Sequence, residues 1–467
     1  MKSFDLAVIG GGAAAFGAAI KANDLGARTA LINRGLPLGG TCVNVGCVPS
    51  KTLLWAAELL HIAEHHRIPG IEIAIKHIDF AAVVRDELAL VELLRREKYD
   101  QLLKGLDHVR SIDGEAHFTA PSEIDVNGER IAADKIVIAT GSTATVPSIS
   151  GLAEAGYLTH IEALALQRRP ESLIVIGAGP LGLEFGQMYA RFGTRVTILQ
   201  RGPLVFPRTE ARLAQRLAEI LQFEGLRIVT SATIDRARVV DGKKEITYTV
   251  GGHTEIALAD EILLATGKTA NTARLRLSAA GVDMDARQAI RVTPFLQTSN
   301  ANVYAAGDVT NLPKRLEMTA GREGTLAAEN ALTGAQKQID YDAVPYTVFT
   351  DPQLAGVGLT EDEQMERLGV CACRTIPLSE VPKALITKRT EGLIKMAIHP
   401  HTGQIMGVHI LAPHASELVA EAMMLVRNRN TIDDVVESLP MFPTLSESIK
   451  LVALAFTRDI SQLSCCI

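Results

Sequence analysis

Residues 4–15, FDLAVIGGGAAA, and residues 173–184, LIVIGAGPLGLE, share one pattern. In each segment, a short apolar run leads into Gly-x-Gly-x-x-Ala or Gly-x-Gly-x-x-Gly, and a stretch with helical periodicity follows. The first glycine of such a fingerprint allows a tight turn, the second lets the backbone approach a pyrophosphate, and the third small residue packs the helix on the sheet. The pattern therefore predicts a strand, a turn and a helix whose N-terminus faces phosphates.

The two fingerprints belong to a longer internal repeat. After each fingerprint, the next apolar run ends on a residue with an amide side chain, Asn33 in ALINRG and Gln200 in TILQRG. Each of these residues lies 23 residues after the first glycine of its fingerprint. Two further matching segments are IVIATGS at 136–142 and ILLATGK at 262–268. Because these features recur in register, we expect an α/β protein with two Rossmann-like dinucleotide-binding domains.

The composition indicates a multidomain globular protein. The chain has 467 residues, of which 47% are hydrophobic and 21% charged, and at roughly 100–200 residues per domain this length favours about three domains. After residue 345, short strand and helix patterns continue without a third fingerprint, so we expect an α+β domain with an interface role there. A net charge of −6 offers no basic surplus for nucleic acid or an anionic membrane. No apolar run approaches the ~18 residues of a membrane helix, and we expect a soluble cytoplasmic protein.

The residues that end the second strand of each repeat bear on nucleotide preference. An acidic side chain normally stands about 20 residues past the fingerprint and binds the ribose hydroxyls. The amides Asn33 and Gln200 stand there instead, and Arg201 follows the second one. A missing acid and an adjacent cation favour NADPH over NADH at the second site. The alternative is that Arg201 is only a solvated residue at a strand end.

Six cysteines occur as three pairs, and Cys42 and Cys47 follow the first nucleotide-binding unit in GGTCVNVGCVPSK. Five residues of ideal helix advance about 7.5 Å, which exceeds the roughly 4.4–6.8 Å between the Cα atoms of a disulfide. A bridge therefore needs a distorted turn, for which Gly46 supplies freedom. A helix N-terminus would lower the thiol pKa. We expect a redox-active pair, and the alternative is two inert buried cysteines.

The other two pairs have different settings. Cys465 and Cys466 are adjacent near the end of the sequence and suit thiol exchange or soft-metal capture, although a chance occurrence in a tolerant tail is an alternative. Cys371 and Cys373 alternate on an expected strand and point to one face, and we interpret them as structural or incidental.

These motifs resemble the class I flavoprotein pyridine nucleotide-disulfide oxidoreductases over essentially the whole chain. The matching segments are Gly10–Ala15, residues 39–51, Gly177–Glu184, ATG at 265–267, YAAGDV at 304–309 and PTLSE at 443–447. The resemblance implies an FAD-binding domain at 1–145 and 271–344 with an NADPH-binding domain inserted at 146–270. It also implies a dimerisation domain at 345–467 that completes the partner's active site in a homodimer.

The resemblance also implies roles for individual residues. Cys47 would form the flavin-contacting thiolate and Cys42 would exchange with substrate. Lys51 and Glu184 would form an ion pair beside the reactive part of the flavin. The residues implied to bind FAD are Gly10, Gly12, Ala15, Asn33, Gly35, Thr41, Lys51, Ala116, Gly141, Gly307 and Asp308. Those implied to bind NADPH are Gly177, Gly179, Gly182, Gln200, Arg201 and Gly267.

One departure from the family bears on the substrate. Members that reduce disulfides place a histidine before the proline of the C-terminal motif, paired with a glutamate, because a thiol leaving group needs an acid/base partner. Here Phe442 precedes that proline, and Glu447 keeps its place. Phenylalanine cannot transfer a proton, which argues against dithiol–disulfide substrates.

The missing histidine and the LSCC segment at 463–466 resemble the mercury(II)-reducing members of the family, as do TCVNVGC, VFTDPQ and VPKAL. The resemblance implies that Hg(II), as a thiol complex, and NADPH give Hg(0), NADP⁺ and a proton. Cys465 and Cys466 would pass the metal across the dimer to Cys42 and Cys47. Alternatives are a thioredoxin-reductase-like or other disulfide reductase, and a flavoprotein whose tail only buffers soft metals. Two tyrosines typical of mercuric reductases are absent, with Thr444 at one position and Glu317 or Met318 at the other.

Overall fold

The computed structural model describes residues 2–464, and the chain divides into two compact units. The first unit comprises Met1–Thr52, Ala82–Val146 and Gly267–Tyr341, and the second comprises Leu53–Ala81, Pro147–Thr266 and Asp342–Ile467. Helices α3 (Cys47–His65) and α4 (Phe80–Arg95) each begin in one unit and end in the other.

A seven-stranded sheet forms the centre of the first unit, in the order β3-β2-β1-β6-β5-β4 with β16 also paired to β6. The strands β3, β2, β1, β6 and β16 are parallel, whereas β5 and β4 are antiparallel. The chain passes from β1 through helix α1 to parallel β2, which is the βαβ unit that the first fingerprint predicts. The strands are β1 (Lys2–Ile9), β2 (Thr29–Asn33), β3 (Val109–Asp113), β4 (Ala116–Ala120), β5 (Glu123–Val126), β6 (Glu129–Ile138) and β16 (Val303–Ala305), with a separate pair β7 (Ser142–Ala144) and β15 (Lys268–Ala270).

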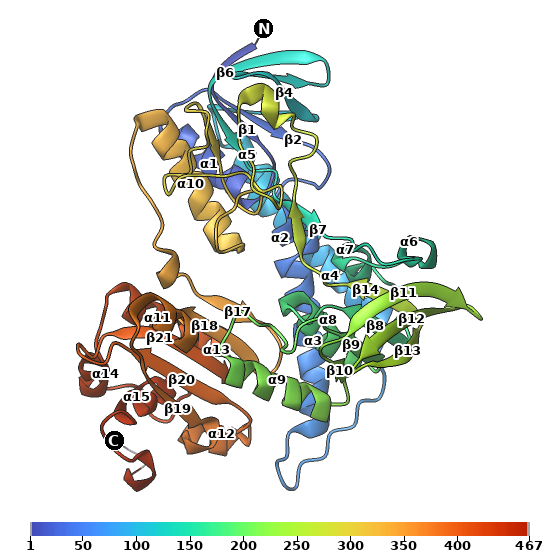
Figure 1. Cartoon of the computed structure of the whole chain (residues 1–467), viewed down its shortest axis with the longest axis vertical. Helices are drawn as coiled ribbons and strands as arrows, with labels where there is room; N and C mark the ends of the chain where they lie inside the picture. The colour runs from blue at the N-terminus through green and yellow to red at the C-terminus, as the bar shows by residue number, and fades with distance from the viewer. Residues whose placement is uncertain (1, 465–467) are drawn as a thin grey trace. The chain divides into compact units, whose positions relative to one another are not determined.

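Both faces of β1 are buried, as expected for a central parallel strand. Leu6 and Val8 pack with helices α1 (Ala13–Asp24) and α10 (Glu317–Thr333), while Ala7 and Ile9 join the core on the opposite face. The helices α1 and α10 lie side by side (Figure 1). A Cβ atom on Gly324 would lie 1.9 Å from the Ala14 carbonyl oxygen, so glycine is needed for this approach. The other helices of this unit are α2 (Gly40–Val45), η1 (Arg96–Asp100), α5 (Gln101–Lys104) and η2 (Leu277–Ala280). The short helix η3 (Tyr341–Ala343) begins at Tyr341, the last residue of the unit.

The second unit contains three sheets. A four-stranded parallel sheet has the order β10-β9-β8-β14, a three-stranded antiparallel sheet follows β11-β12-β13, and a five-stranded antiparallel sheet has the order β17-β18-β21-β20-β19. The strands are β8 (Ser172–Ile176), β9 (Arg195–Leu199), β10 (Arg227–Val229), β11 (Thr233–Val240), β12 (Lys243–Val250), β13 (His253–Ala259), β14 (Glu261–Leu264), β17 (Tyr346–Val348), β18 (Gln353–Gly358), β19 (Ala372–Pro377), β20 (Leu393–Ile398) and β21 (Ile405–Ala412).

The helices of the second unit include α8, which follows β8 and completes the second βαβ unit with β9. They are α6 (Leu152–Ala155), α7 (His160–Leu164), α8 (Pro180–Arg191), α9 (Ala211–Phe223), α11 (Glu361–Leu368), η4 (Leu378–Glu380), α12 (Pro382–Thr387), α13 (Ala415–Arg427), α14 (Ile432–Glu437), α15 (Glu447–Leu454) and η5 (Ile460–Gln462). Figure 1 shows the five-stranded sheet with its helices in orange and red.

The α/β fold class with two Rossmann-like units and a C-terminal α+β part is confirmed. The three domain boundaries stay a prediction, because the second compact unit contains both the second fingerprint and the C-terminal sheet. Within residues 2–464, no helix combines the length and the apolar character needed to cross a membrane.

Candidate active site

The two cysteines of the GGTCVNVGC segment lie on either side of a helix break. Cys42 is in α2, Cys47 begins α3, and Gly46 between them has φ −130° and ψ −112°. A Cβ atom on Gly46 would lie 2.8 Å from the Thr41 carbonyl oxygen and 3.2 Å from the Cys42 Cα atom. Only glycine lets the chain fold back this closely. The break is the distorted turn that the five-residue spacing requires.

A carboxylate completes this cluster. The Sγ atoms of Cys42 and Cys47 and a carboxylate oxygen of Glu317 lie within 4.8 Å of one another. Glu317 is the first residue of α10. A hydrogen bond to Cys47, burial and the charge of Glu317 raise the pKa of Cys42. Burial raises the pKa of Glu317 as well, and a hydrogen bond to Cys42 opposes that shift. The pKa values of both groups are therefore raised above their ordinary ranges.

The expectation that a helix N-terminus lowers a thiol pKa applies to Cys47, which begins α3, and it stays a prediction, whereas the pKa of Cys42 is raised. Its own helix α2 has only six residues, so the dipole at its start is weak. Burial and the adjacent acid outweigh that effect. The acid beside Cys42 is Glu317, one of the two residues that stand where the resemblance to the mercury(II)-reducing members places a tyrosine. Met318, the other of the two, is 82% exposed.

Tyr99 is a residue that sequence reasoning missed. Burial, followed by the charges of Glu317, Cys42 and Cys47, raises the pKa of Tyr99 to about 12. Its ring packs edge-to-face on Phe16 at 4.9 Å between centroids. Tyr99 lies in η1, outside every motif, so no local sequence signal could have found it. The cysteine pair thus has a phenol within electrostatic range.

The predicted FAD-binding residues of the first fingerprint form a cradle of backbone. Gly10 follows β1 with φ +137°, which favours glycine, and Gly12 precedes α1 without a side-chain cap. A Cβ atom on Gly40 would lie 2.6 Å from the Gly12 Cα atom, so two loops meet here without side chains. The uncapped N–H groups of α1 fit a pyrophosphate.

Other predicted FAD-binding residues are held by hydrogen bonds within the first unit. The Asn33 Nδ2 atom donates to the Leu36 carbonyl oxygen at 3.0 Å, and Asp308 accepts from Ser142 Oγ at 2.7 Å. Gly307 has φ +79°, and its N–H donates to buried Glu323 at 2.7 Å. The remaining predicted positions are Ala15 and Ala116, both buried, Gly35 and Gly141, both with positive φ, and Thr41 on α2.

Asn44 provides a second test of cofactor fit. Its Nδ2 atom donates to the carbonyl oxygens of Pro37, Leu38 and Gly40, which pins this loop. Its Oδ1 atom is buried and accepts no hydrogen bond from the described residues. A buried acceptor without a donor is costly, and FAD carries donors. The residues present therefore fit FAD in the first unit.

The second fingerprint is built in the same way. Gly177 follows β8 with φ +106°, Gly179 is the uncapped residue before α8, and a Cβ atom on Gly182 would lie 2.0 Å from the Gly177 carbonyl oxygen. Gln200 links two loops, because its Oε1 atom accepts from the Ala178 N–H at 3.0 Å and its Nε2 atom donates to the Leu204 carbonyl oxygen at 3.2 Å. Arg201 is exposed and Gly267 has φ +103°. The residues of the second unit fit a dinucleotide, whereas Gly267 belongs to the first unit.

The two predicted ion-pair residues lie on different helices. Lys51 is four residues after Cys47 on α3, so both side chains share one face of that helix. Glu184 on α8 is 5% exposed, and its Oε1 atom accepts from the Phe349 N–H at 2.9 Å.

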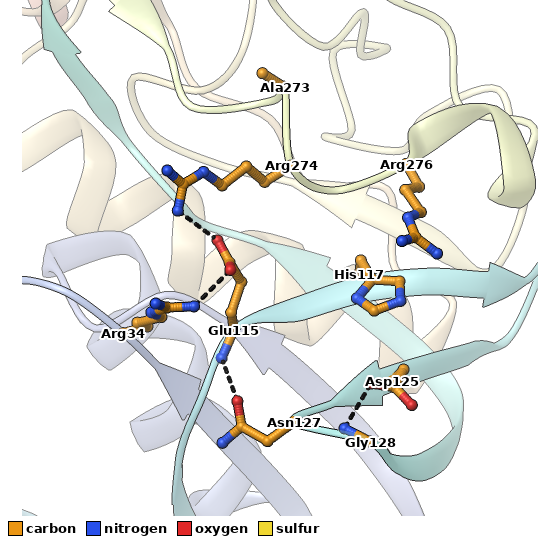
Figure 2. A pocket seen from close by; sticks show the side chains of 9 residues that line it. All are labelled: Arg34, Glu115, His117, Asp125, Asn127, Gly128, Ala273, Arg274 and Arg276. Carbon is orange, nitrogen blue, oxygen red and sulfur yellow. Dashed lines mark hydrogen bonds and ion pairs between the residues drawn. The ribbon is translucent and has the colours of Figure 1, made fainter.

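An open pocket of about 520 Å³ lies beside β4 and β5 in the first unit. Figure 2 shows Glu115 there between Arg34 and Arg274, with contacts of 2.5 and 3.0 Å. A hydrogen bond from Arg274 is the main reason why the pKa of Glu115 is lowered. The pocket is bounded by residues next in sequence to the predicted FAD-binding residues Asn33 and Ala116. Arginines that are already neutralised do not define an additional anion site.

Comparison with known proteins decides the family. Residues 4–332 match the family model of the pyridine nucleotide-disulphide oxidoreductases, and residues 344–453 match the dimerisation domain of the same family. The chain belongs to the pyridine nucleotide-disulphide oxidoreductases. This oxidoreductase is an enzyme that contains FAD and uses a nicotinamide dinucleotide, and its dimerisation domain supports a homodimer.

Its curated relatives include several mercuric reductases, which confirms the resemblance seen in the sequence. The oxidoreductase is 38% identical to the mercuric reductase of Lysinibacillus sphaericus over 99% of this chain and 84% of that protein. It is 38% identical to the mercuric reductase of Streptomyces lividans over 99% of this chain and 98% of that protein. Among solved structures, the HOCl-induced flavoprotein disulfide reductase RclA of Escherichia coli, as a Cu(II) complex, matches with a TM-score of 0.87 and 27% identity, covering 98% of this chain and all of that one.

The C-terminal motif of this oxidoreductase has no acid/base pair. Phe442 is 41% exposed, and Glu447 at the start of α15 is 4% exposed. The Glu447 Oε2 atom accepts no hydrogen bond from the described residues, and burial raises the pKa of this carboxyl. Thr444 bonds to Ser446 Oγ at 2.9 Å and to the Met441 carbonyl oxygen at 2.7 Å. Cys466 and its neighbour Cys465 lie outside the described residues, so their predicted roles stay predictions.

Proposed function

We propose that this oxidoreductase uses NADPH to reduce Hg(II), delivered as a thiol complex, to Hg(0). The observation that supports this most directly is the chemistry of two motifs, the cysteine pair and the C-terminal motif. Two thiols stand together at Cys42 and Cys47, whereas the C-terminal motif presents Phe442 where a proton-transferring histidine would stand. A soft cation needs thiolate ligands, and its reduction to Hg(0) cleaves no substrate disulfide, so that step requires no proton for a substrate sulfur.

The residues of the chain would act in a defined order. Cys42 would displace one external thiol from the metal, forming a mercury–sulfur bond while its proton leaves with the departing thiol. Cys47 would displace the second thiol in the same way. Glu317, beside Cys42, would carry the proton of that thiol to the departing external thiolate. Bound FAD supplies two-electron transfer from the nicotinamide. Lys51 and Glu184 would position charge at the reacting centre.

The remaining assignments belong to the same proposal. Cys465 and Cys466 would take the metal from external thiols and pass it to the Cys42–Cys47 pair of the partner in a homodimer. NADPH would be preferred over NADH, because no acid stands at Gln200 to repel a 2′-phosphate and Arg201 is exposed next to it. Relatives named mercuric reductases, matched over 84% and 98% of their own length, support the substrate.

Steady-state NADPH oxidation tests the proposal. We expect oxidation to rise with Hg(II) in excess small thiol and to stay flat with thioredoxin, lipoamide or glutathione disulfide. Oxidation that responds to a disulfide and not to Hg(II) would refute the proposal in favour of a disulfide reductase. Flavin binding with no response to any of these substrates would point instead to a flavoprotein that only buffers soft metals.

The tail is tested by replacement of its thiols. Cys465→Ser with Cys466→Ser should slow turnover of thiol-bound Hg(II). The matched control is Cys371→Ser with Cys373→Ser, which removes the same number of thiols elsewhere and should leave turnover unchanged. Equal kinetics for the tail variant and the wild type would exclude a delivery role for the tail.

A further inference from the structure

Cys371 and Cys373 form a second thiol pair in the C-terminal sheet. Cys371 directly precedes β19, and Cys373 is the second residue of that strand, which lies at one edge of the five-stranded sheet. Alternate residues of an extended chain share a face. Ala372 between them packs against the hydrophobic core on the opposite face. Both cysteines are partly exposed and neither forms a disulfide.

Helix α11 adds a carboxylate to the thiol pair. A carboxylate oxygen of Glu361, the first residue of α11, lies within 4.8 Å of both sulfur atoms, which lie within 4.8 Å of each other. The capping box of Thr360 with Glu363 fixes this end of the helix. Three groups that can ligate a metal thus meet on one face, from segments about ten residues apart.

Two further contacts hold these groups in place. The Cys371 thiol donates to Gln364 Oε1 at 3.6 Å, and the Gln364 Nε2 atom donates to the Ile398 carbonyl oxygen at 2.9 Å. Because Gln364 is fully buried, its amide orientation is fixed toward the thiol. Lys395 Nζ lies 2.6 Å from a carboxylate oxygen of Glu361 and anchors it beside the sulfur atoms. Such outer contacts orient the ligands of metal sites.

We propose that Cys371, Cys373 and Glu361 form a binding site for a thiophilic divalent cation such as Zn(II) or Hg(II). The site goes beyond the mercury reaction proposed above and does not depend on it. Two thiols lose their protons to solvent and form two metal–sulfur bonds, so a divalent cation leaves the pair neutral. Two sulfur atoms, each about 2.3 Å from one metal, lie about 3.8–4.6 Å apart, which agrees with the observed cluster.

The geometry favours a metal over a disulfide between these residues. Residues two apart in an extended chain have Cα atoms separated by about 6.6 Å, at the upper end of the range for a disulfide. A metal needs only that the ligand atoms converge on one point, and the two sulfur atoms and the Glu361 carboxylate oxygen already lie within 4.8 Å of one another.

Metal content of the holoenzyme tests the site. Chelator-treated protein is dialysed against Zn(II), and separately against Hg(II), and the bound metal is measured by atomic emission. We expect the wild type to retain one equivalent more than Cys371→Ser with Cys373→Ser. Glu361→Gln should weaken Zn(II) binding by at least about tenfold, because a ligand is lost and even an outer contact of a metal site is worth that much. Equal metal content with both cations would overturn the proposal.

A second measurement isolates the site from the other thiols. In a variant with serine at positions 42, 47, 465 and 466, Co(II) should produce a thiolate-to-metal charge-transfer band. Adding Cys371→Ser and Cys373→Ser should abolish it. A band that persists would place the bound metal elsewhere. NADPH oxidation by the Cys371→Ser, Cys373→Ser protein, in which the other thiols are intact, should match the wild type and show that the fold is preserved.

Discussion

The substitution Gly179→Ala tests whether a dinucleotide approaches the second fingerprint, because it should weaken nucleotide binding while leaving the stability of the fold nearly unchanged. Gly179 has φ −78° and ψ −177°, which alanine adopts without strain, and its Cβ atom would have no atom within 4 Å. The expected loss in the free energy of unfolding is below about 1 kcal/mol, because alanine is only a poorer N-cap than glycine. A methyl group at this position would stand where the backbone must approach a pyrophosphate.

The obstruction by this methyl group should lower the affinity for NADPH. We expect KM for NADPH to rise about tenfold or more, which corresponds to about 1.4 kcal/mol of lost affinity, while kcat at saturating NADPH changes little. The matched control is Gly182→Ala, whose Cβ atom would lie 2.0 Å from the Gly177 carbonyl oxygen. Overpacking of this kind costs about 1–3 kcal/mol of stability.

The assays are NADPH titration of the steady-state rate and urea unfolding of both variants. The reasoning requires that Gly179→Ala weakens nucleotide binding with near-normal stability and that Gly182→Ala lowers stability. An unchanged KM for NADPH in Gly179→Ala would show that no pyrophosphate approaches this glycine. Equal destabilisation of both variants would show that the space beside Gly179 does not exist.

Three other predictions concern ionisable groups that are buried or half-buried. Glu317→Gln should lower the pKa of Cys42, because a like charge beside the thiol is removed; alkylation by iodoacetamide across pH should then accelerate at neutral pH, and an unchanged profile would contradict the cluster. Glu87 is fully buried, neither carboxylate oxygen has a partner among the described residues, and its pKa is raised from 4.5 to about 7 by burial. Between about pH 4.5 and 7 the folded state therefore holds a proton that the unfolded state has lost, and the wild type loses stability as the pH rises. Glu87→Leu should become progressively more stable than the wild type over this range. Urea unfolding at several pH values measures the difference, and a pH-independent difference would argue against the raised pKa. Lys395→Met should lower the free energy of unfolding in urea by about 3–5 kcal/mol, because its buried partner Glu210 loses its cation. The control Arg367→Ala breaks an exposed pair with Asp342 and should cost less than about 1 kcal/mol. Equal costs would show that burial does not matter for these pairs.

Local backbone requirements made much of the fold predictable from the sequence. The turn at Gly10 needs a positive φ, and the close approaches at Gly46 and Gly182 leave no room for a side chain. Such requirements act over a few residues, so the sequence records them as glycines at fixed spacing. The same reasoning predicted that a bridge between Cys42 and Cys47 needs a distorted turn, for which Gly46 supplies freedom.

The surroundings of the cysteines depend on the tertiary structure. Glu317 joins Cys42 from 275 residues further along the chain, and Tyr99 reaches the same charges from a segment without any motif. Periodicity and spacing cannot record such contacts, because they arise when elements distant in sequence pack together. The sequence determined the two Rossmann-like units and the glycine between the paired cysteines, since these rest on local backbone geometry. Packing alone decided which acid stands beside Cys42, since that depends on how α10 lies against the rest of its unit.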